Sequence, residues 1–203
     1  MKKIPMLFAM TFDDEGRRVV DFSTFNERAI DALEGREIVA TRKMDGTAMM
    51  TDEDGNWFAR RIVKPGKKIP SGFVEVDFDP ATGKHVGWVP AETSPFAKFW
   101  REAVREAENE FEPGTTWELI GPKVNGNPEH AERHMLVRHG EIEVEDFPAI
   151  EEIMTHDDPR ALLEPIFERF RAEDVEGIVW WADGVPAVKL RAKDFFPEMD
   201  SRW

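Results

Sequence analysis

The chain of 203 residues contains no cysteine. Disulfide bonds and thiolate metal sites are therefore excluded, and nothing ties the chain to an oxidising compartment. Long apolar runs are missing too, because no stretch approaches the roughly 18 apolar residues that span a bilayer. The first residues are broken by Pro5 and soon followed by the acidic Asp13, Asp14 and Glu15, unlike a signal peptide. We therefore expect a cytoplasmic protein with no membrane partner.

Positive charge is scarce. The 41 Asp and Glu residues outnumber the 27 Lys and Arg residues, which gives a net charge of -14. A protein that coats nucleic acid needs accumulated lysine and arginine, so this balance argues against that class, and any polyanion must bind locally. The segment 58–68 fits a local site because it carries five basic residues and no acidic one. A solvated basic loop explains the segment equally well.

Strand patterns dominate the chain. The predicted strands are residues 37–42, 47–50, 57–63, 115–120, 135–138, 176–181 and 185–191. The second and third form a hairpin closed at Gly55, and the last two form a hairpin closed at Asp183-Gly184, since these turn residues accept positive φ angles. Lys43 directly follows the first strand and lies where a strand meets a tight turn.

Two long helices are predicted among the strands. The first starts at Ser94, which would cap it, has Pro95 in its first turn, and repeats apolar residues at helical spacing up to Pro113. The second covers residues 159–171. Residues 64–93 are rich in proline, glycine and charge, so we expect a long loop there. These patterns predict an α+β fold of antiparallel sheets flanked by helices, with hydrophobic residues (41%) sufficient for one sizeable core.

Four short segments follow one another along the chain. They are Lys43-Met-Asp45-Gly46-Thr47, Trp117-Glu118-Leu-Ile-Gly121, Glu176-Gly177-Ile-Val-Trp180 and Val188-Lys189-Leu-Arg191. In this order they resemble the nucleotidyltransferase motifs of the ATP-dependent ligase and RNA-capping superfamily. A lone Lys-x-Asp-Gly is common by chance, whereas four motifs in the family order are not. The resemblance implies a single nucleotidyltransferase domain over residues 1–203 with an ATP-grasp-like fold.

The resemblance implies a nucleophile and its helpers. In that superfamily the motif lysine, here Lys43, attacks the α-phosphate of ATP and forms a lysyl-AMP phosphoramidate. Burial and neighbouring cations such as Lys189, Arg191 and Arg42 would help the amine to lose its proton. Lys189 and Arg191 alternate by two on one strand, so both face the same side. The resemblance makes this the α-phosphate side.

The other motif residues imply contacts with the nucleotide. Gly46, next to Asp45, would let the backbone approach the nucleotide closely, although a plain turn glycine is the alternative. Glu118 would accept a hydrogen bond from a ribose hydroxyl. The alternative interpretation is that Glu118 is an exposed acidic residue of a strand with no role in binding. Glu176 would hold Mg²⁺ or Mn²⁺, directly or through water, as pyrophosphate leaves.

The chain departs from the superfamily pattern at two points. Many members carry arginine five residues after the lysine, where this chain has Ala48. Either Arg60 or Arg61 would supply that cation, and Arg60 is our choice. Members also stack an aromatic residue on the adenine after the glutamate motif, yet none lies between Glu118 and Pro128. The adenine contact is therefore left unassigned.

The end of the chain and two further segments indicate which members of the superfamily the chain resembles most. Only residues 192–203 follow the last motif, so we expect no C-terminal oligonucleotide-binding (OB) domain, which argues against a capping enzyme and weakens a DNA-ligase interpretation. Residues 82–90 and 118–128 resemble a compact group of RNA ligases. The implied reaction joins a 5′-phosphate end of RNA to a 3′-hydroxyl end through an adenylylated 5′ end, as in RNA repair. A DNA or mixed-substrate ligase, and a self-adenylylating module that acts through a protein partner, stay open.

Two remaining segments carry weaker signals. Residues 125–127, Asn-Gly-Asn, form either a turn at the nucleotide or an ordinary loop. His130-Ala-Glu-Arg-His134 has two histidines at the spacing of a zinc protease, but that motif needs glutamate directly after the first histidine. Scattered surface or core histidines explain this segment better than a zinc site.

Overall fold

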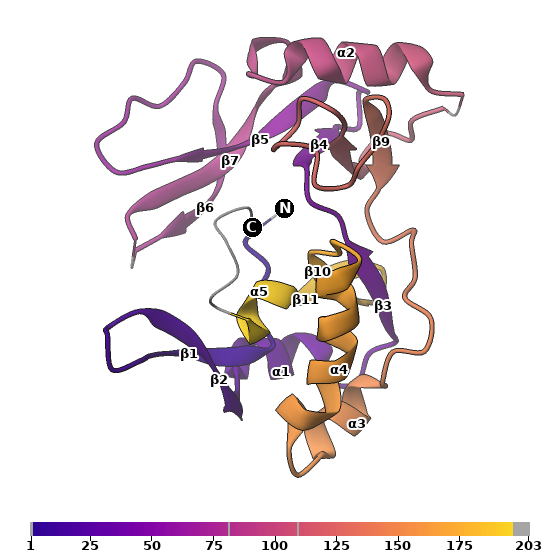
Figure 1. Ribbon diagram of the computed structural model, residues 1–203. Coiled ribbons are helices and arrows are strands. Elements are labelled where there is room, and N and C mark those ends of the chain that lie inside the picture. The colour runs from indigo at the N-terminus through magenta and orange to yellow at the C-terminus, as the bar shows by residue number, and fades with distance from the viewer. Residues whose placement is uncertain (1, 81, 109, 197–203) are drawn as a thin grey trace. The chain divides into compact units, whose positions relative to one another are not determined.

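A computed structural model describes residues 2–80, 82–108 and 110–196 of the chain (Figure 1). The chain divides into two compact units. The six-stranded unit comprises Met1–Lys3 and Asp45–His139, and the lysine unit comprises Ile4–Met44 and Gly140–Trp203. The boundary falls inside the Lys43-Met-Asp45-Gly46 motif. The single domain over residues 1–203 stays a prediction.

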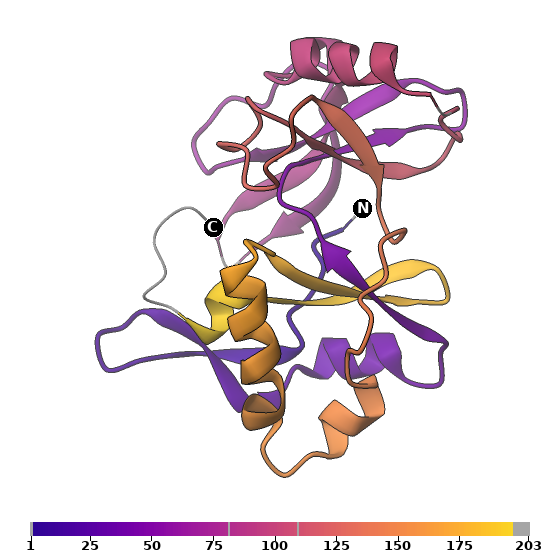
Figure 2. The ribbon, with the colours of Figure 1, turned by 45° about the vertical axis from the view of Figure 1, so that its right-hand side comes forward.

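In the six-stranded unit, the described residues form one antiparallel sheet in the order β6-β7-β5-β4-β8-β9. The strands are β4 (Thr47–Thr51), β5 (Trp57–Val63), β6 (Val74–Asp79), β7 (Lys84–Pro90), β8 (Thr116–Ile120) and β9 (Met135–Arg138). A short 3-10 helix, η1 (Ala91–Thr93), leads into α2 (Ala97–Glu106), which lies over the sheet (Figure 2). Trp100 and Ala103 of α2 join Met49, Ala59 and Leu119 in one core.

Strands β6 and β7 show that the predicted long loop over residues 64–93 is wrong. Residues 74–79 read Val-Glu-Val-Asp-Phe-Asp, an alternation of apolar and acidic residues that is typical of a strand. Gly83, with a φ angle of 63°, lies in the turn between the two strands. Much of the proline and glycine that indicated a loop belongs to the turns on either side of β6. The composition of the region concealed the alternation inside it.

Helix α2 is shorter than predicted, and Ser94 does not cap it. The hydroxyl of Ser94 donates to the carbonyl of Ala91, the first residue of η1, and accepts from the backbone amide of Phe96 at 3.2 Å, while Phe96 stands at the cap position of the helix. The helix begins at Ala97 and ends at Glu106. Several glutamates follow, and negative charge is unfavourable at the C-terminal end of a helix because unpaired carbonyl groups lie there. The apolar repeat therefore continues in the sequence after the helix has ended.

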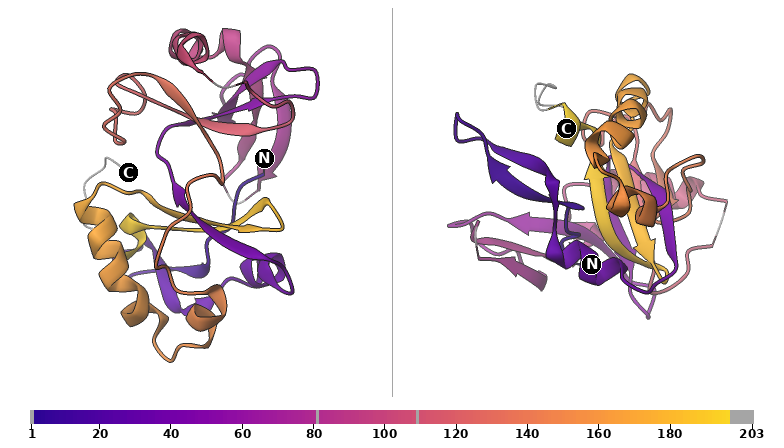
Figure 3. Two further views of the ribbon diagram at one scale, coloured as in Figure 1. Left: turned by 90° about the vertical axis from the view of Figure 1, so that its right-hand side faces the viewer. Right: turned by 90° about the horizontal axis from the view of Figure 1, so that it is seen from below.

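In the lysine unit, the described residues form a three-stranded antiparallel sheet and a separate hairpin. The sheet has the order β11-β10-β3, with β3 (Ile38–Lys43), β10 (Gly177–Ala182) and β11 (Val185–Arg191). The hairpin of β1 (Phe8–Phe12) and β2 (Arg18–Phe25) projects from the rest of its unit (Figure 3). The helices in this part of the chain are α1 (Glu27–Leu33), α3 (Ile150–Thr155), α4 (Pro159–Ala172) and α5 (Ala192–Phe195).

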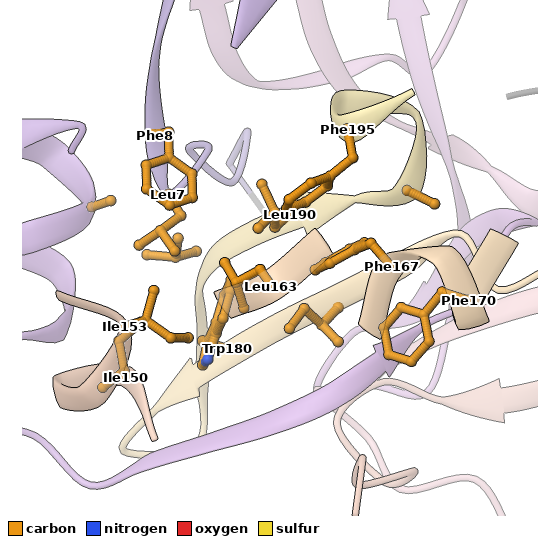
Figure 4. Packing of buried hydrophobic residues seen from close by; sticks show 14 of the residues in the cluster. Leu7, Phe8, Ile150, Ile153, Leu163, Phe167, Phe170, Trp180, Leu190 and Phe195 are labelled. Carbon is orange, nitrogen blue, oxygen red and sulfur yellow. The ribbon is translucent and has the colours of Figure 1, made fainter. Parts of the chain in front are cut away.

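One face of the three-stranded sheet carries the core of the lysine unit. Figure 4 shows Trp180 and Leu190 of this face together with Leu163 and Phe167 of α4. All four side chains are almost completely buried. Successive residues of a strand point to opposite faces, so the residues between them point away from this core. The apolar face thus anchors the strands and leaves the other face for polar side chains.

The α+β class with antiparallel sheets is confirmed, and so are the predicted strands and the helix over residues 159–171. The missed helices α1, α3 and α5 have seven residues or fewer, too short for a clear helical repeat. Within the described ranges no helix is long and apolar enough to cross a membrane. The prediction about the segment after Arg191 falls partly on residues 197–203, which lie outside the described residues.

Candidate active site

Lys43 ends β3, and its amine makes an ion pair with the carboxylate of Glu176. Both side chains are mostly buried, with 23% and 12% of their surface exposed. Glu176 directly precedes β10, whose first residue, Gly177, pairs with Lys43 across the sheet. This register brings the amine and the carboxylate to the same end of the three-stranded sheet.

Gly177 has to be glycine for reasons of backbone geometry. Its φ angle is 154°, and a Cβ atom there would lie only 2.1 Å from the carbonyl oxygen of Leu190 and 2.7 Å from the Cα atom of Arg191. Gly177 stands in register with Lys43 on one neighbouring strand and with Arg191 on the other. Because Gly177 has no side chain, β11 can approach β10 closely. No side chain on β10 stands between the cations Lys43 and Arg191.

Lys189 and Arg191 lie two residues apart on β11, on the sheet face that Lys43 shares. Burial first, and then the positive charges of Lys43 and Arg191, lower the pKa of Lys189 to about 8. The negative charges of the unit act in the opposite direction but do not cancel this effect. A desolvated cation beside two others favours an anionic ligand.

Asp194 of α5 orients the guanidinium of Arg191. Its two carboxylate oxygens accept hydrogen bonds from Nε at 3.1 Å and from Nη2 at 2.7 Å, and one also accepts from the backbone amide at 2.9 Å. Such bidentate pairs hold the guanidinium plane and leave its other N–H groups for a ligand. Our sequence reasoning missed Asp194, although a carboxylate three residues after a strand-ending arginine is a capping signal.

Arg42 does not join this group. It is in register with Ile178 on β10, and therefore lies on the face opposite Lys43. The structure thus brings together Lys43, Glu176, Lys189 and Arg191, whereas the placement of Arg42 does not support a role beside the amine.

Glu118 lies in β8 of the six-stranded unit and is only 9% exposed. One of its carboxylate oxygens lies 2.6 Å from Nε2 of His139. Because a carboxylate only accepts hydrogen bonds, Nε2 carries the proton and donates it. The other ring nitrogen, Nδ1, is buried and has no hydrogen-bond partner in the described part of the chain. The alternative of an exposed strand acid is therefore excluded for Glu118.

Arg60 shares the sheet face of Glu118: Ala59 and Trp117 are both in register with Met49 on the strand between them, and the next residue on each strand points to the opposite face. Its guanidinium carbon lies 5.9 Å from the ring centroid of Trp88. Burial lowers the pKa of Arg60, while the charges of Glu118 and Asp77 act to raise it. Arg61 points to the opposite face and is exposed. Of the two candidates, the structure therefore brings Arg60 to the side of Glu118.

The Asp45-Gly46 turn is held by the loop that follows β8. The side-chain amide of Asn125 donates to the carbonyl of Gly46 at 2.5 Å, and the carboxylate of Glu129 accepts from the backbone amide of Asp45 at 2.7 Å. A Cβ atom on Gly46 would lie 2.2 Å from the carbonyl oxygen of Leu119. Close packing against the backbone of β8 is thus sufficient to require glycine at position 46. A role of Gly46 in binding the nucleotide stays a prediction. The Asn-Gly-Asn turn contacts the motif.

The histidine pair and the acidic residues give little support for a metal held by protein alone. His134 contacts Glu102 at 2.7 Å and stacks on Phe99 with ring centroids 4.6 Å apart. Across the described ranges, no group of three or more His, Asp or Glu side chains could hold a metal ion. Glu176 offers one hard oxygen ligand. This fits Mg²⁺ or Mn²⁺ only where substrate phosphates and water supply the other ligands.

Residues 109–196 match the model of a family described as RNA ligase 1. This match supports a relationship to an RNA ligase family. It covers less than half of the chain and includes Glu118, Glu176, Lys189 and Arg191, but not the segment that contains the motif lysine. No curated protein matches the chain.

Proposed function

We propose that this protein is an ATP-dependent RNA ligase in which Lys43 becomes a lysyl-AMP. One observation carries the proposal: the amine of Lys43, paired with Glu176, shares a sheet face with Lys189 and Arg191. Glu176 pairs with Lys43 and Asp194 with Arg191, so this partly buried group of three cations and two carboxylates keeps one excess positive charge, which an anionic ligand would compensate. The phosphates of ATP are the anions that this group would bind.

In the first step, Nζ of Lys43 attacks the α-phosphorus of ATP. A nitrogen–phosphorus bond forms, the bond to the bridging oxygen breaks, and pyrophosphate leaves with the electron pair. The amine must give up a proton, and the Glu176 carboxylate is within hydrogen-bond reach to accept it. Lys189 and Arg191 would stabilise the negative charge that grows on the α-phosphate oxygens in the transition state.

Glu176 would also hold a divalent cation, through the carboxylate oxygen that is not paired with Lys43. When bound, Mg²⁺ or Mn²⁺ neutralises charge on the departing pyrophosphate. The protein itself contributes the single carboxylate, its orientation at the start of β10, and the two cations on β11.

Glu118 would recognise the ribose of the nucleotide. His139 binds one of its carboxylate oxygens, so the other oxygen is available to accept a hydrogen bond from a ribose hydroxyl. We infer that His139 is a positioning residue that acts through Glu118. Arg60, on the same sheet face, would add a positive charge for the phosphates.

The later steps use the same lysine as a leaving group. The 5′-phosphate of an RNA strand attacks the phosphorus of lysyl-AMP, the nitrogen–phosphorus bond breaks, and the amine is regenerated. A 3′-hydroxyl then attacks the adenylylated 5′ end, forms the phosphodiester and releases AMP. The match to RNA ligase 1 supports RNA as the strand that is joined.

Incubation with α-labelled ATP and Mg²⁺ or Mn²⁺ tests the proposal. We expect label on the protein, its transfer to 5′-phosphorylated RNA, and a joined product when a 3′-hydroxyl strand is present. Joining of DNA alone would establish a DNA ligase. Label that stays on the protein with either strand would indicate a self-adenylylating module that acts through a protein partner, and absence of label would refute the proposal.

A further inference from the structure

The basic segment 58–68 ends in a turn that presents lysines to solvent. In the turn Lys64-Pro65-Gly66-Lys67, the amide of the last residue donates to the carbonyl of the first at 3.1 Å. Gly66 has a φ angle of 72°. Proline at the second position and glycine at the third are the residues that such a turn favours, so its backbone is pre-organised.

Four cations in and beside this turn make no ion pair with the described residues. We call them the basic edge: Arg61, Lys64, Lys67 and Lys68. All four are exposed. Other exposed cations of the same unit do have partners, such as Arg101 with Glu92 at 2.9 Å and Arg138 with Glu112 at 2.6 Å. The chain has a net charge of -14, so four exposed cations within eight residues form a local exception to its overall acidity.

Three acidic residues of the same sheet have other partners. They lie on β6 and are Glu75, Asp77 and Asp79. Glu75 lies 2.5 Å from Nδ1 of His85, and Asp79 makes an ion pair with Lys3 at 3.0 Å. Asp77 accepts a hydrogen bond from the backbone amide of Lys3 at 3.3 Å. None of these three carboxylates forms an ion pair with the basic edge in the described part of the chain.

Exposed apolar side chains flank the basic edge in the sequence, and two of them, Ile62 and Val74, lie on the sheet face of Arg60. Ile62 is 52% exposed, Ile69 is 47% exposed, and Val74 on the edge strand β6 is 55% exposed. Cations beside exposed apolar side chains suit a ligand that combines negative charge with flat apolar groups. A nucleic-acid strand has both.

We propose that the basic edge binds the phosphate backbone of the RNA strand that the protein joins, an inference that rests on the proposed function. Lys64 lies four residues beyond Arg60 on the chain, about 13 Å at the rise of a strand. This distance equals about four phosphate steps along a duplex. The basic edge therefore contacts RNA several nucleotides from the end that is joined, and not the nucleotide that reacts.

The test is the triple variant Lys64→Glu/Lys67→Glu/Lys68→Glu. Its control is Lys98→Glu/Arg101→Glu/Arg105→Glu on α2, which makes the same change in net charge at exposed positions of the same unit. Binding of 5′-phosphorylated RNA, labelled at its 3′ end, is measured without ATP over a range of salt concentrations. We expect the first variant to bind a long strand at least about tenfold more weakly. The slope of log K for binding against log salt concentration should become smaller in magnitude by about two, whereas the affinity of the control should stay within about twofold of the parent. Binding of a 5′-phosphorylated dinucleotide, too short to reach the basic edge, should be equal in all three proteins.

Three outcomes overturn the inference: unchanged RNA binding in the first variant, which would leave the basic edge to an acidic protein partner; equal weakening in both variants; or equal weakening for the dinucleotide. Circular dichroism checks that both variants are folded. Lysyl-AMP formation from labelled ATP needs no RNA. Its absence from the parent protein would refute the proposed function while the RNA-binding result still stands by itself.

Discussion

The two units of the chain hold their charged residues in different ways. In the lysine unit, Lys43, Lys189 and Arg191 share one face of a small sheet, and mutual repulsion and burial lower the pKa of Lys189. In the six-stranded unit, Glu118 is bound by His139, and its charge acts favourably on Arg60. In the first arrangement the charge of Lys189 is held at a cost in free energy, which a phosphate ligand would offset, whereas in the second the charges of Arg60 and Glu118 favour each other.

This contrast predicts two kinetic signatures. Changes in the lysine unit should lower the rate of lysyl-AMP formation at saturating ATP, because those groups act on the charge that grows in the transition state. Changes around Glu118 should mainly raise the KM for ATP. The predictions below test this division, beginning with the largest effect.

Lys43→Ala should reduce lysyl-AMP formation by at least about a thousandfold, because it removes the nucleophile. Lys43→Arg should be equally inactive, since a guanidinium stays protonated. Labelled ATP followed by denaturing electrophoresis measures the adduct, and thermal unfolding checks that both variants fold. An adduct that survives in either variant would assign the nucleophile to another residue.

Lys189→Met should lower the rate of lysyl-AMP formation by about a hundredfold, the usual effect of removing one charge-stabilising group. It should also stabilise the protein, because a lysine whose pKa falls from 10.5 to about 8 on folding opposes folding wherever both states are protonated. We expect a gain of about 1–3 kcal/mol in the free energy of unfolding at pH 7. Lys98→Met, at a well exposed position of α2, is the matched control and should change neither quantity.

The same residue should give the parent enzyme a pH dependence. Above pH 8, the free protein loses the charge on Lys189, so kcat/KM for ATP should fall as pH rises past this value. The unfolding free energy should rise between pH 8 and 10.5, because the unfolded state binds more protons there. Lys189→Arg keeps its charge and should remove the falling limb of the rate profile. An unchanged profile in Lys189→Arg would mean that another group titrates.

Sequence patterns predicted which side chains share a sheet face more completely in the lysine unit than in the six-stranded unit, for a physical reason. Residues 176–191 form a hairpin whose turn and strands are adjacent in sequence, so the alternation that puts Lys189 and Arg191 on one face can be read directly. Pairing of Glu118 with His139 instead depends on the register of β8 and β9. No local pattern reports that register.

The orientation of the neighbouring arginines Arg60 and Arg61 also depends on strand pairing that the sequence does not reveal. The sequence does not show whether Arg60 or Arg61 faces Glu118. Only the pairing of β4 with β5 and with β8 decides this. The loop predicted over residues 64–93 failed for another reason, since its turn residues outweighed the alternation of β6. Contacts that depend on the pairing of distant strands were beyond sequence reasoning, whereas contacts within one hairpin were not.

His139→Ala should have the smallest effect and the one that best tests the division between the units. Loss of one hydrogen bond to Glu118, worth about 1 kcal/mol, corresponds to about a fivefold rise in the KM for ATP, with kcat within about twofold. His139→Gln should recover part of the loss, because its amide can donate to the same oxygen. If His139 acts through Glu118, the double variant with Glu118→Gln should be no worse than Glu118→Gln alone. A fall in kcat with unchanged KM would give His139 a part in the chemical step, and the six-stranded unit would then contribute more than recognition.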